Sequence, residues 1–339
     1  MNILTDNSLA HYTTMGIGGP AKTIVSVTSE QDIIEAVAYA RQNQLKLIVI
    51  GQGSNIIFGD GGFDGLVIVN AIPGLLIDSA TGQVRIGAGT SWHEVVTKTV
   101  EAGLVGVEAM PLIPGTAGAT PINNVGAYGQ EIKDTLLFVR AYDTQTDTFV
   151  EINNSDCAFG YRSSRFKTTD YGRFIISSIT LQLKQTPTNY TAPNYPALTA
   201  SLQEHDIYYP TPDDVMRNVI AIRMSKLPDP KQLANTGSFF KNPIVPAEKA
   251  QQLLAEFPNM PTYPREDGTV KLAGGWLIET AGLKDLRLHG MWVYEKQALV
   301  LVNENAHSFA DLAAMVNHIQ STVNQLFGVQ LEPEPEIFS

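Results

Sequence analysis

Two loops rich in small residues have the composition to cradle an anionic ligand. The first, Gly51-Gln52-Gly53-Ser54-Asn55, directly follows the apolar run Leu45–Ile50, which predicts a strand buried on both faces. The second runs from Pro114-Gly115-Thr116-Ala117-Gly118-Ala119 into Asn123-Asn124-Val125-Gly126-Ala127-Tyr128-Gly129. Glycines let a backbone approach a ligand closely, and successive N–H groups can form an anion-binding nest. Two such loops indicate one extended ligand with a pyrophosphate, although a simple turn and a structural glycine-rich crossover remain the alternatives.

The two loops suit a flavin dinucleotide better than a mononucleotide. A third glycine pattern does not add support for a dinucleotide site. Gly16–Ala21 fits G-x-G-x-x-A by letter, yet no apolar strand precedes it and Pro20 leads into a strand. A Rossmann fingerprint needs a strand before it and a helix after it. We therefore reject this motif as a Rossmann site.

Three further segments carry residues that could act on a substrate. Arg162, in Phe159-Gly160-Tyr161-Arg162, can bind a carboxylate through two parallel hydrogen bonds, although a lone arginine more often forms a surface ion pair. In Gly237-Ser238-Phe239-Phe240-Lys241-Asn242-Pro243 the Ser238 hydroxyl stands between a glycine and two aromatics that could exclude water, or the segment is a β-bulge with a buried phenylalanine pair. The third segment, near the end of the chain, is Glu332-Pro333-Glu334-Pro335-Glu336. Its carboxylates could act on a substrate, or the segment is a solvated acidic tail.

Several classes of chemistry find no support. The chain has no G-x-S-x-G elbow, so hydrolase chemistry is not indicated. Its six histidines show no ligand spacing, and we predict no catalytic metal. Cys157 is the only cysteine, which rules out an intrachain disulfide, suits a reducing compartment and indicates a small buried residue.

Composition points to an ordinary globular protein. Apolar residues make up 44% and charged residues 17% of the 339 residues, enough for two or three domains. The formal net charge of -11 argues against a nucleic-acid partner. Met1–Asp6 lacks the basic start and apolar run of a signal peptide, and no apolar stretch is long enough to span a membrane, so we expect the cytoplasm and no membrane partner.

The elements that must position these residues alternate between strands and helices. Periodic apolar residues predict a helix from Thr28 or Ser29 through Arg41 and another at about Trp92–Ala102, ended by Gly103. A Pro- and Tyr-rich connection, Pro187–Pro212, reads as a boundary or as a loop that folds over something. The remaining expected elements are strands at Leu136–Tyr142, Thr148–Ile152, Phe174–Leu183 and Ala298–Val302, and helices at Asp213–Ser225, Ala247–Glu256 and Ala310–Leu326.

Taken in order, these motifs resemble the UDP-N-acetylenolpyruvoylglucosamine reductase family over essentially the whole chain. The segments that carry the resemblance are Thr14–Ala21, Gly51–Asn55, Ile113–Gly129, Phe159–Arg162, Lys226–Pro230, Gly237–Pro243, Lys271–Ile278 and Leu331–Glu334. Single motifs are weak, but the ordered set is specific. The connection around Tyr190–Leu198 resembles the substrate loop of the type I branch, where the family's usual Leu-Thr-Tyr-Gly reads Ala192-Pro193-Asn194-Tyr195-Pro196.

The resemblance implies an α+β fold of three parts. It is similar to a two-subdomain FAD-binding fold of the vanillyl-alcohol-oxidase type, followed by a C-terminal α+β substrate-binding domain. The implied division is FAD-binding subdomain 1 at 1–70, subdomain 2 at 71–218 and the substrate-binding domain at 219–327. A C-terminal strand within 328–339 is implied to return to subdomain 1.

The resemblance also implies a reaction and roles for residues. NADPH reduces a non-covalent FAD, and flavin N5 then gives hydride to the enolpyruvyl group of UDP-N-acetylenolpyruvoylglucosamine, which yields UDP-N-acetylmuramate for peptidoglycan synthesis. Ser238 gives the proton, while Arg162 and Glu334 stabilise the enolate. Substrate-binding residues are implied to be Tyr161, Tyr195, Lys226, Asn242 and Gln297. FAD-binding residues are implied to be Gly51, Gln52, Gly53, Ser54, Asn55, Pro114, Gly115, Gly118, Ala119, Asn124, Gly126, Ala127 and Tyr128.

Two rival functions stay open from the residues alone. One is an FAD-dependent oxidase of small alcohols on the same fold, whose reduced flavin would react rapidly with oxygen. The other is a nucleotide-sugar binding protein without flavin. For the reductase we expect only small-molecule partners, UDP-N-acetylenolpyruvoylglucosamine and NADPH, together with a monomer and no nucleic-acid or membrane partner.

Overall fold

The computed structural model describes residues 3–338, which form two compact units. Unit 1 comprises residues 3–7, Ala21–Gln52 and Phe63–Ser225, and unit 2 comprises Ser8–Pro20, Gly53–Gly62 and residues 226–338. Met1, Asn2 and Ser339, at the ends of the predicted segments 1–70 and 328–339, lie outside the described residues. The three-part division of the chain stays a prediction.

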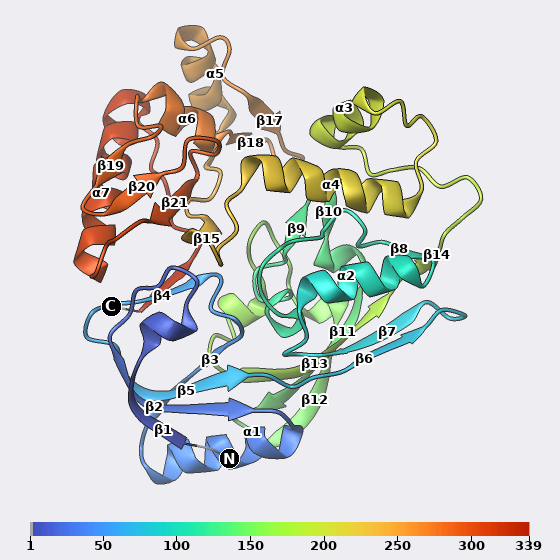
Figure 1. The fold of residues 1–339 in the computed structure, drawn as a ribbon, viewed down its shortest axis with the longest axis vertical. Coiled ribbons are helices and arrows are strands. Elements are labelled where there is room, and N and C mark those ends of the chain that lie inside the picture. The colour runs from blue at the N-terminus through green and yellow to red at the C-terminus, as the bar shows by residue number, and fades with distance from the viewer. Residues whose placement is uncertain (1–2, 339) are drawn as a thin grey trace. The chain divides into compact units, whose positions relative to one another are not determined.

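The first sheet of unit 1 is covered by a capped helix. Its strands, in the order β1-β2-β5-β3, are Ile3–Ser8, Pro20–Val27, Phe63–Asn70 and Lys46–Ile50. Helix α1 (Glu30–Gln42) begins at Ser29, whose side chain accepts the Asp32 N–H in a capping box. Its buried face, which includes Ile33 and Val37, packs with Val25 and Leu66 of the sheet (Figure 1). The periodicity of the sequence therefore located this helix correctly.

A five-stranded antiparallel sheet forms the other layer of unit 1. Its order is β12-β11-β13-β7-β6, with strands Thr148–Asn153, Leu136–Asp143, Phe174–Gln182, Gln83–Gly87 and Leu75–Asp78. Helix α2 (Trp92–Glu101) packs on it, and Trp92 is 1% exposed. Helices α3 (Pro196–Glu204) and α4 (Pro212–Lys226), and the strand pairs β9 (Gly126–Ala127) with β10 (Gln130–Glu131) and β8 (Leu104–Val105) with β14 (Lys184–Gln185), complete the unit.

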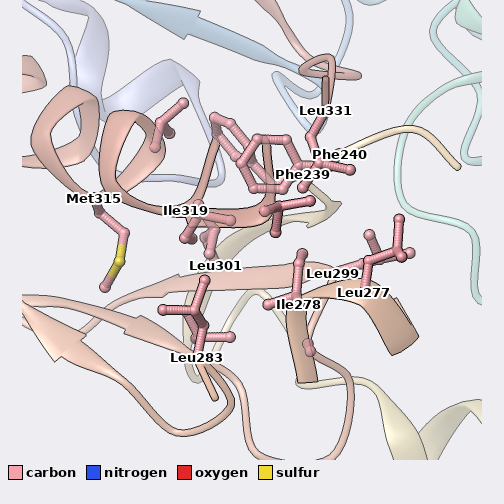
Figure 2. Close-up of a cluster of buried hydrophobic side chains, with 14 of the residues drawn as sticks. Phe239, Phe240, Leu277, Ile278, Leu283, Leu299, Leu301, Met315, Ile319 and Leu331 are labelled. Carbon is pink, nitrogen blue, oxygen red and sulfur yellow. The ribbon is translucent and has the colours of Figure 1, made fainter. Parts of the chain in front are cut away.

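Unit 2 encloses the largest of the hydrophobic clusters around a four-stranded sheet. The sheet order is β15-β21-β20-β19, with strands Ala234–Ser238, Val300–Asn303, Met291–Val293 and Arg287–Leu288. Figure 2 shows Phe239 and Phe240, which follow β15, meeting side chains from helix α6 (Gly274–Thr280), β21 and helix α7 (Phe309–Phe327) in this core. The other elements are β16 (Ile244–Pro246), β18 (Thr269–Leu272), β17 (Thr262–Pro264), α5 (Ala247–Glu256), and β4 (Ile56–Phe58) paired in parallel with β22 (Glu336–Phe338).

The mixed helices and sheets confirm the predicted α+β class, with three corrections of detail. The strand expected to be buried on both faces, β3, buries Ile48 and Ile50, whereas Leu47 and Val49 on its other face pack against the α1 core but stay partly exposed. Helix α3 lies inside the connection that we expected to be irregular, with Pro196 at its first turn. The strand expected at Ala298–Val302 begins two residues later, at Val300.

Candidate functional site

The first small-residue loop leaves β3 through a glycine pair with little free space. Gly53 has φ +65°, and a Cβ added to it would lie 1.8 Å from the carbonyl oxygen of Tyr12. Thr14 also donates its N–H to the Gly53 carbonyl at 3.0 Å. A Cβ on Gly51 would lie 2.5 Å from Oγ1 of Thr116, in the second loop. The two predicted loops therefore do meet, at Gly51 and Thr116, and the sites of both glycines exclude side chains.

The second loop is bound to the start of α2. Trp92 donates its N–H to the Gly115 carbonyl at 3.1 Å, and Gly118 donates its own to the Ala88 carbonyl at 2.9 Å. Ala119 donates to the Thr116 carbonyl at 3.0 Å. These last two N–H groups are engaged within the protein, so they are not available to donate to a ligand.

Asn124 connects this loop to the segment of Arg162. The side chain is fully buried, and its residue has φ +44°. Its Nδ2 donates to Glu131 Oε2 at 2.9 Å and to the Gly160 carbonyl at 3.1 Å, while its Oδ1 accepts the Lys133 N–H at 3.2 Å. The side-chain amide of Asn124, a residue that we expected to bind the cofactor, is thus hydrogen-bonded inside the protein.

Arg162 lies in a tight turn against the same loop. Gly160 and Ser163 exchange backbone hydrogen bonds, and Arg162 between them has φ +52°, a left-handed conformation that is unusual for arginine. Its guanidinium donates to the Gly126 carbonyl at 3.1 Å and stands 5.4 Å from the centre of the Tyr161 ring. The proposed FAD loop and the proposed carboxylate-binding arginine are therefore one connected structure.

Arg223, on α4, was missed by sequence reasoning. One terminal nitrogen donates to the Leu112 carbonyl at 3.1 Å, and Leu112 itself has φ +54°. The Arg223 Nε is buried without a hydrogen-bond partner, and among residues 3–338 this side chain forms no ion pair. Burial lowers the pKa of its guanidinium, while the nearby Tyr128 hydroxyl acts in the opposite direction. An uncompensated buried cation next to the second loop is a candidate anion contact.

The tyrosines assigned to ligands are close to one another in unit 1. Tyr128 and Tyr195 meet edge to face, with ring centroids 5.1 Å apart. Burial raises the pKa of Tyr128, so its hydroxyl stays protonated at neutral pH and can donate. Tyr195 is 40% exposed, which leaves part of its ring open to a ligand.

In unit 2, Ser238 lies at an irregularity in the pairing of β15 with β21. The register of β15 against β21 shifts between Asn235 and Ser238, and Gly237 has φ +71°. Phe239 and Phe240, which follow, are fully buried (Figure 2). The β-bulge and the buried phenylalanine pair are therefore both present, and together they fix where Ser238 lies.

The same backbone also carries Glu334. Glu334 donates its N–H to the Phe239 carbonyl at 2.8 Å, which places this glutamate beside the residue that follows Ser238. The segment is no free acidic tail, because Leu331 is fully buried and Glu336 lies in β22. Two of the three predicted catalytic residues are thus brought together by main-chain pairing.

Asn242 and Gln297 lie near the start of α6. Asn242 Oδ1 accepts the Gly274 N–H at 2.9 Å, and a Cβ on Gly275 would lie 2.9 Å from Gln297 Oε1. Lys226 is the last residue of α4 and is exposed. The predicted catalytic and substrate-binding residues are divided between the two units. Unit 1 contains Tyr161, Arg162 and Tyr195, and unit 2 contains Ser238, Asn242, Gln297 and Glu334.

The described part of the chain shows no metal site, no reactive thiol and no membrane-spanning helix. No three His, Cys, Asp or Glu side chains of residues 3–338 are grouped so that they could hold a metal ion. Cys157 is fully buried, and burial raises the pKa of its thiol to about 12. None of the helices in residues 3–338 combines the length and the apolar character that crossing a membrane requires.

Comparison with known proteins agrees with this geometry. Residues 21–153 match the model of an FAD binding domain, and residues 229–338 match the C-terminal domain of UDP-N-acetylenolpyruvoylglucosamine reductase. The solved reductase of that name from Thermus caldophilus covers 100% of this chain and 98% of its own, with a TM-score of 0.69 at 23% identity. A 6-hydroxy-D-nicotine oxidase from Arthrobacter nicotinovorans shares the fold, with a TM-score of 0.54 over 97% of this chain and 86% of its own, at 13% identity.

Fold and loops thus define an FAD-dependent oxidoreductase with a second α+β unit. Proteins named UDP-N-acetylenolpyruvoylglucosamine reductase from Ralstonia nicotianae and Escherichia coli are 43% and 39% identical to it, each over 97% of this chain and 97% and 95% of their own lengths. The chain belongs to the UDP-N-acetylenolpyruvoylglucosamine reductase family, which confirms the resemblance stated from its motifs.

Proposed function

We propose that this enzyme reduces the enolpyruvyl group of UDP-N-acetylenolpyruvoylglucosamine to the lactyl ether of UDP-N-acetylmuramate, with NADPH as reductant, in peptidoglycan precursor synthesis. The observation that carries the proposal is the bulge of β15, which sets Ser238 beside the segment of Glu334. A serine and a glutamate held by buried backbone suit proton transfer in a dry site. Membership in the reductase family supplies the substrate class.

The two small-residue loops fit FAD. Gly51 and Gly53 allow the first loop to pack closely against Thr116 and Tyr12, and Arg223, beside the second loop, lacks an anionic partner among residues 3–338. FAD, when bound there, supplies the group that accepts hydride from NADPH and gives it to the terminal carbon of the enolpyruvyl double bond. We assign Arg223 to an anionic oxygen of a bound dinucleotide or nucleotide sugar.

Arg162 and Glu334 are assigned to the substrate carboxylate. As hydride reaches the terminal carbon, negative charge grows on this carboxylate in an enolate-like arrangement. A guanidinium can oppose that charge through two hydrogen bonds. Arg162 lies in a left-handed turn against the second loop, where its guanidinium donates to the Gly126 carbonyl and is positioned before the substrate binds. A protonated Glu334 would add a hydrogen bond to the same oxygens.

Ser238 is assigned as the donor of a proton to the carbon bonded to the ether oxygen. The addition of hydride to one carbon and of a proton to its neighbour completes the reduction of the double bond. Lys226, Asn242, Gln297, Tyr161 and Tyr195 are assigned to the substrate, with Lys226 opposing the diphosphate as a point charge. We further propose a monomer in the cytoplasm, without a nucleic-acid or membrane partner.

The test separates the two half-reactions by rapid mixing under anaerobic conditions. The purified protein should carry flavin that NADPH bleaches and that UDP-N-acetylenolpyruvoylglucosamine then restores. Ser238→Ala should leave bleaching nearly normal and slow the restoration by about 10²–10⁴-fold, the scale of a lost general acid. A normal restoration rate would remove Ser238 from the mechanism. Flavin restored by oxygen but not by the sugar nucleotide would favour an oxidase, and absence of flavin would favour a binding protein.

A further inference from the structure

A short segment of unit 1, residues 190–195, is fixed at both ends, and we call it the strap. At its first end the Tyr190 hydroxyl donates to Glu108 Oε1 at 2.9 Å, across 82 residues of sequence. At its last end the Tyr195 ring meets Tyr128 of the second loop. Between them, Asn194 and Pro193 lie against Gly129, where an added Cβ would be 3.6 Å from atoms of both residues.

Glu108 is an unusual anchor because it is a buried carboxylate without a cation. It is 3% exposed, and among the described residues it forms no ion pair with lysine, arginine or histidine. Its Oε2 accepts the Gly106 N–H at 2.5 Å, and its Oε1 accepts the Tyr190 hydroxyl. Both carboxylate oxygens are thus used by neutral donors, and hydrogen bonds of this charge-assisted kind are stronger than neutral ones.

Tyr190 is well suited to remain the donor. Burial raises the pKa of its hydroxyl, and the negative charge of Glu108 raises it further. The hydroxyl therefore keeps its proton throughout the neutral pH range. Tyr190 also packs with the cluster around Leu198 and Val219, so the strap is in contact with helices α3 and α4.

Residues 108–109, which anchor the strap through Glu108, also contact the second loop. Ala109, the neighbour of Glu108, donates its N–H to Gln130 Oε1 at 2.8 Å. Gln130 follows Gly129, against which the strap lies. Residues 108–109 therefore hold the strap with one contact and the loop beneath it with the other, so they determine the distance between the two.

We propose that Glu108 is a positioning residue: acting through Tyr190, it fixes the strap so that Tyr195 stands beside the second loop in the place from which it contacts the nucleotide sugar. This inference rests on the proposed function, which assigns Tyr195 to that ligand. The hydrogen bond to Tyr190 would connect the Glu108 carboxylate to the binding of substrate.

The experiment combines Tyr190→Phe, Glu108→Ala and the double variant in a cycle. Each single change should raise the KM for UDP-N-acetylenolpyruvoylglucosamine by about 10-fold or more, the scale of a hydrogen bond to a charged acceptor. The rate of flavin reduction by NADPH should stay within about twofold. The double variant should be no worse than the more affected single variant, because the two side chains act through one bond. Tyr209→Phe is the matched control, since Tyr209 lies in the same connection and is 95% exposed.

The outcomes separate this inference from the function on which it rests. Wild-type enzyme that fails to turn over the sugar nucleotide would overturn the proposed function and the positioning role with it. Normal wild-type turnover, with an unchanged KM in Tyr190→Phe, would overturn the positioning role alone. A fall in thermal stability with equal losses in both half-reactions would show that the bond is merely structural, and Tyr190→Phe decides the matter even if Glu108→Ala does not fold.

Discussion

Asn124→Ala should damage the second half-reaction more than the first. The substitution removes three hydrogen bonds, to Glu131, Gly160 and Lys133, from a side chain that is fully buried. At about 0.5–1.5 kcal/mol each, their loss costs roughly 2–4 kcal/mol, and a left-handed conformation costs alanine about 1 kcal/mol more than asparagine. We therefore expect the free energy of unfolding to fall by about 3–5 kcal/mol.

The effect on catalysis follows from the contact with Gly160. This carbonyl belongs to the turn that carries Arg162, so without Asn124 the turn keeps fewer of its bonds to the second loop. A displacement of about 1 Å at a positioning group can cost on the order of 10²-fold in rate. We expect flavin reoxidation by the sugar nucleotide to slow by about that factor, while reduction by NADPH changes by less than about fivefold.

Rapid mixing of each half-reaction, at a temperature well below the melting point of the variant, measures both rates. Asn123→Ala is the matched control, because Asn123 is the neighbouring amide and receives a bond from Lys167 Nζ at 2.6 Å that does not involve the turn. It should leave both rates nearly unchanged. If Asn124→Ala slowed the two half-reactions equally, or left reoxidation within threefold of normal, the reasoning about Arg162 would be refuted.

Three further predictions concern the cofactor loop, acid stability and the thiol. Gly53→Ala should abolish retention of flavin absorbance through purification because its Cβ would lie 1.8 Å from a carbonyl oxygen, whereas Gly61→Ala, with nothing within 4 Å, should retain it. Arg173 holds the pKa of buried Asp143 at about 2, below its usual 3.8, so this pair contributes about 2 kcal/mol that is present above pH 3.8 and lost as pH falls towards 2. Urea unfolding at pH 5 and pH 2.5 should show a smaller difference for Asp143→Asn than for the wild type. Cys157 should resist iodoacetamide at pH 8 until the protein is unfolded, as mass spectrometry can follow, because burial raises its pKa to about 12.

Local patterns in the sequence predicted the elements well, because the forces that set them are local. The cap at Ser29 and the apolar spacing after it identify α1, and the glycine-rich stretches after β3 and before β9 identify the loops. The failures are equally physical. Helix α3 lies in a proline-rich connection that reads as irregular, and the apolar run of β3 does not reveal that one of its faces is covered less completely than the other.

The contacts that organise the candidate site could not be read from the chain, because they join residues far apart in sequence. The bond from Asn124 to Gly160 spans 36 residues, and the bond from Arg223 to Leu112 spans 111. No spacing rule connects such pairs, so neither contact could be predicted from the sequence. The motif order supplied the family, and with it the roles expected of Ser238 and Glu334; the structure supplied what holds them in place.

Arg223 shows how an acidic chain can still prepare a place for an anion. The sequence has 34 acidic against 23 basic residues, so carboxylates were available to pair with it. Other partly buried arginines are paired: Arg140 with Glu30 at 2.7 Å, and Arg173 with Asp143 at 2.6 Å. Leaving a buried guanidinium unpaired costs free energy that a protein carboxylate would have offset. We infer that the compensating negative charge comes from a ligand, and that the second loop and α4 are arranged to receive it.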